Sequence, residues 1–299
     1  MPNQFSTGLI PSPYDKRDIL TAEIIPEIKR IPKECPCPFD LSILNQNGFP
    51  HCVGYSGAGI KQYLEAKEKI WKIYDGSWLY RECKKIDGMP DLDGTYFRIL
   101  LKVLQKIGAK PLNELESEAE KYKIGAYAQV LPLTFDELKK MIFLYGVVLL
   151  GFYGDDIGWQ NDYVKPPQTP KWGHAVFGIN YDESYIYFQN SWGENWGIKG
   201  IGHFDKNYLP FEAWIPLIDF PTKYQGIDLI ADGYVAKEYL KAIKYYPGQE
   251  VKVNTIWGLR LRREPMGTIL EILPNGKEIM ILEDEDLENG GYKWVKIHK

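Results

Sequence analysis

The sequence is short of cysteine, with only four in 299 residues (Cys35, Cys37, Cys52 and Cys83). Proteins that depend on a disulfide scaffold are much richer in cysteine, so such a scaffold is excluded and a reducing compartment is favoured. The N-terminus has no basic start followed by an apolar run, so no secretory signal is visible. We therefore expect a cytoplasmic protein, which would leave the cell only by lysis or a leaderless route.

Long hydrophobic runs and an excess of charge are also missing. No stretch approaches the ~18 uninterrupted apolar residues of a membrane-spanning helix. The 36 basic and 40 acidic side chains give a net charge of −4, which provides no attraction to nucleic acid or to an anionic membrane. We expect neither a nucleic-acid partner nor a membrane span.

Proline is concentrated at the N-terminus, where residues 1–38 contain seven. Such a segment has little helical or strand periodicity, and we predict an extended arm on the surface of the fold. Only residues 16–25, before Pro26, could form a helix, which leaves no room for a complete inhibitory pro-domain.

The next part of the chain divides into a helical half and a β-rich half. Apolar residues at helical spacing predict helices over 52–74 and 95–107, and a capping box predicts a third helix beginning at Thr134. After residue 145 the segments are short, β-branched and aromatic, as strands are. They are GVVLLGFYG, HAVFGINYD, SYIYFQNSW, IGHFD and EAWIPLIDF. We assign residues 1–221 to one domain.

The C-terminal part has a different pattern. Residues 222–250 are predicted to be a connector with a short helix at about 235–244. Residues 251–299 alternate apolar and polar positions around a Pro-Asn-Gly turn, which indicates a small all-β barrel.

Cys52 has the setting of a nucleophile, because it stands where a loop becomes a helix. The partial positive charge of a helix N-terminus lowers the pKa of a thiol and stabilises its thiolate. Cys35 and Cys37 lie in the proline-rich arm, and Cys83 lies among charged residues. With no second cysteine pair, Cys35 and Cys37 are interpreted as ordinary thiols rather than as half of a metal site, and no metal or cofactor is expected.

His174 is the most suitable base among the four histidines. It begins an apolar strand directly after Gly173, where a side chain can project into a cleft. Asn190 follows at the end of the next strand, and a hairpin turning near residue 182 would bring it back to the level of His174. An amide oxygen there can orient the imidazole.

These residues resemble the catalytic set of papain-like (C1) cysteine peptidases. Gln46, Cys52, His174 and Asn190 occur in the family order, and Ser191-Trp192-Gly193-x-x-Trp196-Gly197-x-x-Gly200 follows. The resemblance covers roughly residues 8–220. It implies an α+β fold with a helical lobe and a β-barrel-like lobe on either side of a cleft. It also implies that Gln46 and the Cys52 N–H form the oxyanion hole.

The resemblance assigns substrate-binding roles as well. Gly94 with Thr95 stands where the family has a glycine pair that binds substrate backbone, and Gly173 and Trp192 flank the catalytic pair. The residue after Cys52 is Val53, where the family commonly has Trp. The opening GLIPSPYDKRD is similar to the arm of bacterial and phage-type members without a pro-domain.

The C-terminal barrel resembles bacterial SH3-like domains. The matching pieces are Leu259-x-Leu261-Arg262-x-x-Pro265, Gly276 before Ile279-x-Ile281-Leu282, and Trp294-Val295-Lys296-Ile297. Such domains often bind cell wall or peptides, so a ligand of this kind is expected by analogy.

The sequence therefore predicts a cysteine endopeptidase that acts on a protein or peptide through Cys52 and His174. Two alternatives stay open. One is a lysin of the same chemistry that cuts peptidoglycan peptides, and the other is an inactive papain-like binding protein in which Cys52 is a buried structural thiol.

Overall fold

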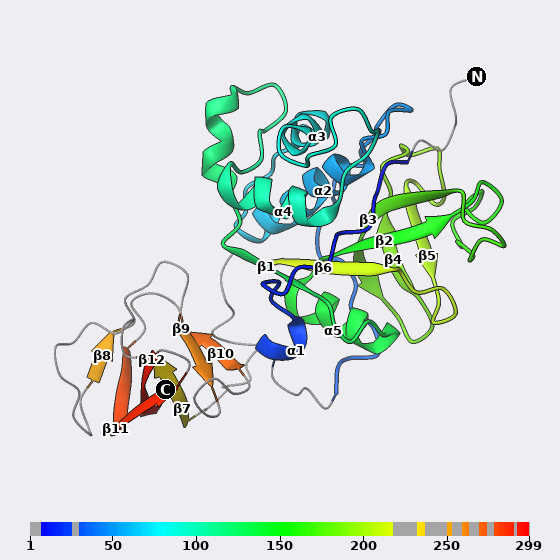
Figure 1. The fold of residues 1–299 in the computed structure, drawn as a ribbon. Helices are drawn as coiled ribbons and strands as arrows, with labels where there is room; N and C mark the ends of the chain where they lie inside the picture. The colour runs from blue at the N-terminus through cyan, green and yellow to red at the C-terminus, as the bar shows by residue number, and fades with distance from the viewer. Residues whose placement is uncertain are drawn as a thin grey trace. The chain divides into compact units, whose positions relative to one another are not determined.

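The computed structural model describes residues 7–25 and 30–217, and in the C-terminal region the backbone of six strands (Figure 1). The chain divides into two compact units. The first contains residues 1–18 and 30–218, and the second contains residues 19–29 and 219–299.

The helices of the first unit are α2 (Cys52–Lys67), α3 (Gly76–Lys84), α4 (Phe97–Lys106), the 3₁₀ helix η1 (Glu116–Tyr122) and α5 (Phe135–Tyr145). α2 is almost fully buried and packs against α3, α4 and the strand β3 (Trp172–Tyr181). A Cβ on Gly54 would lie 2.2 Å from the carbonyl oxygen of Gly76, so only a glycine allows α2 and α3 to approach this closely.

α2 ends earlier than the periodicity predicted, at Lys67 instead of residue 74. Lys69 takes a positive φ of 63°, and the N–H of Ile70 bonds to the carbonyl of Glu65, which terminates the helix. Ile73 has the spacing of a buried residue but is 39% exposed. α3, which the sequence analysis missed, begins after Asp75, whose carboxylate accepts from the N–H of Trp78.

The other helix predictions are confirmed. α4 lies within the predicted range 95–107. α5 follows Thr134, whose Oγ1 accepts a hydrogen bond from the N–H of Glu137 at 3.2 Å. Gly146, at φ 84°, ends α5 in the left-handed conformation.

The β-rich half forms one six-stranded antiparallel sheet in the order β1-β6-β2-β3-β4-β5 (Figure 1). All five predicted strands are present, and β1 is an additional one. The strands are β1 (Ala126–Gln129), β2 (Val148–Gly154), β3 (Trp172–Tyr181), β4 (Ile186–Gln189), β5 (Ile201–Phe204) and β6 (Glu212–Leu217). The first unit thus has the predicted α+β organisation, with a helical lobe and a sheet lobe.

The second unit contains α1 (Thr21–Ile24) and a six-stranded antiparallel sheet in the order β10-β9-β7-β12-β11-β8. Its strands are β7 (Asp232–Ala236), β8 (Glu250–Lys252), β9 (Leu259–Arg262), β10 (Ile269–Leu273), β11 (Glu278–Asn289) and β12 (Tyr292–His298). β7 lies inside the stretch predicted as a connector, so that stretch contributes to this sheet. The helix predicted at about 235–244 is wrong for residues 235 and 236, which belong to β7. The rest of that predicted helix, and the turn at 274–276, lie outside the described residues. An SH3-like fold for this unit stays a prediction.

Across the described ranges, no helix combines the length and the apolar character needed to cross a bilayer.

Candidate active site

Cys52 is the first residue of α2, and its side chain is fully buried. Burial raises the pKa of the thiol to about 12, and the nearby backbone N–H groups of Ala175, Val53 and Gly8 oppose this only in part. The thiolate expected from the helix N-terminus is therefore not the stable form here. Removal from water disfavours the charged sulfur more than the helix end and its neighbouring N–H groups favour it.

His174 and Asn190 meet as the sequence predicted. β3 and β4 pair so that Phe177 lies opposite Gln189. Asn190 follows directly, and its Oδ1 lies 2.8 Å from Nε2 of His174. The N–H of Ser191 donates to the same Oδ1 at 2.7 Å, which fixes that atom as the oxygen of the amide. Nε2 of His174 must then carry the hydrogen, and the lone pair is at Nδ1.

The imidazole of His174 is neutral in this environment. Burial lowers its pKa from 6.5 to about 4, and the hydrogen bond to Asn190 opposes this only in part. Its Nδ1 is buried and has no hydrogen-bond partner among the described residues. A buried neutral imidazole with its lone pair at Nδ1 is equipped to take a proton from a neighbouring thiol. The residue after His174 is Ala175, whose backbone N–H is near the sulfur of Cys52.

Three tryptophans surround the His174 ring. Trp192 stacks on it at 4.5 Å between ring centroids, and Trp159 and Trp172 approach nearly perpendicular at 5.4 and 6.1 Å. Trp196 contacts this group as well, since its indole N–H donates to the carbonyl of Trp159. Trp159 and Trp172 were missed by sequence reasoning. Trp172 stands two positions before His174, which was a usable signal, whereas Trp159 lies in a loop without one.

Two side-chain hydrogen bonds hold the amide of Gln46. Its Oε1 accepts from Oγ of Ser191 at 2.6 Å, and its Nε2 donates to the carbonyl of Phe49 at 2.6 Å. The backbone N–H of Gln46 also bonds to the carbonyl of Ser191. Ser191, the residue after Asn190, is thus a functional candidate that sequence reasoning passed over, because its side chain and its carbonyl both bond to Gln46.

The predicted substrate-binding residues Gly94, Thr95 and Gly173 all contact the protein's own N-terminal arm. The carbonyl of Gly173 accepts from the N–H groups of Gly8 and Leu9 at 3.2 and 3.0 Å. The N–H of Thr95 donates to the carbonyl of Gly8, and the carbonyl of Thr95 accepts from the N–H of Ile10, as in a parallel β-bridge. Leu9 is only 4% exposed. The expectation that the arm lies on the surface is therefore wrong for this part, because its main chain pairs with both walls of the cleft.

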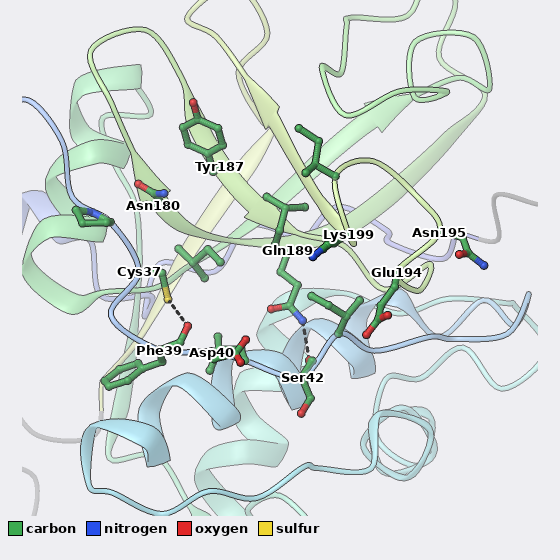
Figure 2. A pocket seen from close by; sticks show the side chains of 16 residues that line it. Cys37, Phe39, Asp40, Ser42, Asn180, Tyr187, Gln189, Glu194, Asn195 and Lys199 are labelled. Atoms are coloured by element: carbon green, nitrogen blue, oxygen red, sulfur yellow. Dashed lines mark hydrogen bonds between the residues drawn. The ribbon is translucent and has the colours of Figure 1, made fainter.

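A separate cavity of about 930 Å³ lies between residues 36–43, β3, β4 and the segment 194–201 (Figure 2). Gln189 reaches across it, and its Nε2 donates to the carbonyl of Ser42 at 2.8 Å (Figure 2). None of the four predicted catalytic residues lines this cavity.

The two cysteines of the arm, Cys35 and Cys37, bond to residues other than the four predicted catalytic ones. Cys37 donates from Sγ to the carbonyl of Phe39, and the N–H of Cys35 bonds to the carbonyl of Tyr181. In the part of the chain that the structure describes, no three His, Cys, Asp or Glu side chains are grouped as metal ligands would be.

The comparisons with known proteins rest on structure. No protein-family model matches the chain, and no curated protein matches its sequence. Among solved structures, the chain is similar to xylellain, a cysteine protease from Xylella fastidiosa, with a TM-score of 0.63 and 23% identity over 73% of this chain and 98% of that one.

Two more distant structures have the same fold. Procathepsin L 3 from the larval midgut of Tenebrio molitor has a TM-score of 0.54 and 15% identity, over 67% of this chain and 76% of that one. The cysteine protease CMS1MS2 of Carica candamarcensis, solved in complex with E-64, has a TM-score of 0.52 and 14% identity, over 63% of this chain and 100% of that one. The first unit of the present chain therefore has the two-lobed papain-like fold.

Proposed function

We propose that this protein is a cysteine peptidase that hydrolyses peptide bonds through Cys52 and His174. The observation that carries the proposal is the oriented imidazole. Asn190 and the N–H of Ser191 together leave the lone pair of His174 at Nδ1, and the N–H of the next residue, Ala175, is near the sulfur of Cys52. A dead fold that kept Cys52 only as a core thiol would have no need of an oriented base.

The first step transfers the thiol proton of Cys52 to Nδ1 of His174. The thiolate attacks the carbonyl carbon of the scissile bond, and the imidazolium then gives its proton to the leaving amine, which departs from the acyl-enzyme. A water molecule, deprotonated by His174, attacks the thioester and releases the carboxylic acid. Cys52 regains its proton, so no cofactor is consumed.

The oxyanion of each tetrahedral intermediate is stabilised by Nε2 of Gln46 and the backbone N–H of Cys52. Ser191 supports this arrangement because it holds Oε1 of Gln46 and thereby fixes the plane of the amide. A donor that is already in position does not have to reorganise as charge develops, and this is the source of most of its catalytic effect.

A peptide is the substrate class that the cleft suits best. Gly173 and Thr95 already bind an extended segment of the chain through main-chain hydrogen bonds alone. Such bonds recognise a polypeptide backbone irrespective of its side chains, as in other cases of strand addition. An SH3-like ligand, whether cell wall or peptide, stays a prediction for the second unit.

The test is hydrolysis of casein and of purified cell wall by the wild type and by Cys52→Ala, with labelling by E-64 as a check on the thiol. We expect casein cleavage by the wild type, slow if the arm stays in place, and none by Cys52→Ala. Loss of cell-wall turbidity without casein cleavage would favour the lysin. If neither E-64 nor iodoacetamide labels Cys52 faster than Cys83, even after release of the arm, the inactive binding protein is the better reading.

A further inference from the structure

Three aromatic rings form a stack beside the start of α2. The imidazole of His51, the residue before Cys52, lies against the ring of Phe49 at 5.4 Å between centroids and against the ring of Tyr80 at 4.1 Å. The interplanar angles are only 19° and 26°, so both pairs are stacked rather than edge-on. His51 is thus the ring that the two contacts share.

The Tyr80 end of the stack is fixed to the helical lobe. Tyr80 lies on α3, is 7% exposed, and its hydroxyl accepts from the N–H of Gly94 at 3.0 Å. A Cβ on Gly54 of α2 would lie 2.7 Å from the backbone nitrogen of Tyr80, so the two helices are in close contact at this residue. Nδ1 of His51 also lies 3.2 Å from Oγ of Ser77 on α3. The His51 ring is therefore held by α3 on one face and at one edge.

The Phe49 end of the stack has less support. Phe49 is 58% exposed, and among the described residues His51 is the ring on which it stacks. The segment before it turns tightly, because the N–H of Phe49 bonds to the carbonyl of Gln46 at 3.0 Å and the two residues between them have positive φ. Loss of the His51 ring would therefore free one end of this turn.

The carbonyl of Phe49 links the stack to the predicted oxyanion hole. It accepts from Nε2 of Gln46 at 2.6 Å and from the backbone N–H of His51 at 2.8 Å. Nε2 of a glutamine amide carries two hydrogens. The bond to Phe49 therefore sets the direction of the second hydrogen, with which the proposed mechanism stabilises the oxyanion.

The imidazole of His51 is neutral at pH 7. Burial and the charge of Arg81 lower its pKa from the ordinary 6.5, and Asp93 opposes them only in part. A neutral ring that stacks on two others acts through its faces rather than through proton transfer. A phenyl ring at this position should therefore serve as well.

We propose that His51 is a positioning residue of the oxyanion hole: its ring holds Phe49 in place, and the Phe49 carbonyl holds the amide of Gln46. The inference rests on the proposed function for its effect on catalysis, whereas its effect on the Gln46 amide is independent of any reaction. A donor that is fixed before charge develops stabilises the transition state more than one that must turn into place. His51 therefore acts on turnover without touching the substrate.

The test compares the wild type with three substitutions in the stack. His51→Ala removes the shared ring, His51→Phe keeps a ring without its nitrogens, and Phe49→Ala removes an exposed side chain but leaves the carbonyl. His203→Ala is the matched control, since His203 on β5 stacks on Tyr163 at 5.2 Å with an interplanar angle of 16°. Hydrolysis of a fluorogenic peptide gives kcat and KM, iodoacetamide gives the alkylation rate of Cys52, and thermal melting verifies folding.

We expect His51→Ala and Phe49→Ala to lower kcat by roughly 10- to 100-fold, as a displaced donor does, with little change in KM. His51→Phe should retain most of the activity, and His203→Ala should leave it unchanged. The alkylation rate of Cys52 should change little in any variant, because alkylation passes through no oxyanion. Wild-type kcat in folded His51→Ala, or a loss in His51→Phe as large as in His51→Ala, would overturn the proposal.

A double-mutant cycle shows whether His51 acts through Gln46. In a Gln46→Ala background no amide is left to position, so His51→Ala should lower kcat no further. Losses that multiply independently would mean that His51 acts on another group, and the positioning role would then be wrong.

An NMR measurement separates this inference from the proposed function. The side-chain amide hydrogens of Gln46, identified by the signals that Gln46→Ala lacks, should exchange with water faster in His51→Ala and Phe49→Ala than in His51→Phe and the wild type. If the wild type hydrolyses no peptide but this order of exchange rates is observed, the peptidase assignment fails and the positioning role is supported. If peptides are hydrolysed but exchange is equal in all variants, the positioning role fails.

Discussion

Oδ1 of Asn190 lies 2.8 Å from Nε2 of His174 in a fully buried contact. The same oxygen is held by the N–H of Ser191, so the amide cannot turn over without losing that bond. The consequence is chemical as well as geometric, since one tautomer of the imidazole is selected and its basic nitrogen is Nδ1.

Asn190→Ala is expected to reduce turnover strongly while leaving the fold intact. Without the amide oxygen, the ring of His174 can rotate and populate the unproductive tautomer. We expect kcat to fall by about 100-fold, the lower end of what general acid–base catalysis contributes. Steady-state kinetics with a fluorogenic peptide would measure this. Asn190→Gln, which can still present an oxygen, should recover part of the loss, and equal activity in Asn190→Ala would contradict the assignment.

Gln46→Ala tests the oxyanion hole separately from the thiol. Because Gln46 acts only on developing negative charge, its removal should lower kcat by about 100- to 1000-fold, or about 3 kcal/mol. The alkylation rate of Cys52 should change little, since alkylation passes through no oxyanion. Ser191→Ala is the companion variant, with a smaller loss of kcat because it only positions Oε1 of Gln46. Loss of alkylation in Gln46→Ala would point to a structural role instead.

The pH dependence of Cys52 alkylation tests the burial of its thiol. The pKa of the thiol is raised to about 12 by burial, so thiolate is the minor form and its fraction increases as pH rises. The rate of alkylation by iodoacetamide should climb about tenfold per pH unit from pH 7 to 10 without a plateau. A rate that levels off near neutral pH would show that the thiol ionises far more easily than its burial predicts.

Acid should destabilise the folded protein through His174. Its pKa is about 4 when buried and 6.5 when free, so between these values the unfolded chain binds a proton that the folded chain does not. Stability is therefore retained above pH 6.5 and is lost as the pH falls toward 4, by about 3 kcal/mol for this one group. Urea unfolding at several pH values measures the slope. His174→Gln should have a shallower slope over this window, and an unchanged slope would place the acid sensitivity elsewhere.

The contact between His174 and Asn190 could be predicted because both residues are marked by their local positions. Cys52 stands at a loop-to-helix junction, His174 lies on β3, and Asn190 directly follows the neighbouring strand β4. These are features of local sequence, and the resemblance supplied Gln46. Five of the six strands of the sheet lobe were predicted for the same reason, because aromatic and β-branched residues in short runs indicate strands.

The N-terminal arm could not be placed from its sequence, for a physical reason. Residues 8–10 contact Gly173 and Thr95 through main-chain atoms, which any residue provides. The proline content of the arm indicated an extended chain but no partner. The low pKa expected for the Cys52 thiol was wrong for a related reason, since it assumed access to water, whereas this side chain is 0% exposed. The end of α2 was missed because Ile70 and Ile73 continue the helical spacing on the exposed side of a turn.

The segment that includes Gly8 and the residues with which it pairs belong to one polypeptide. Diluting the protein cannot separate them, because a tethered segment keeps a fixed effective concentration at its site, on the order of millimolar for short flexible tethers. Any free peptide that binds the main chain of Gly173 and Thr95 must therefore compete against that concentration.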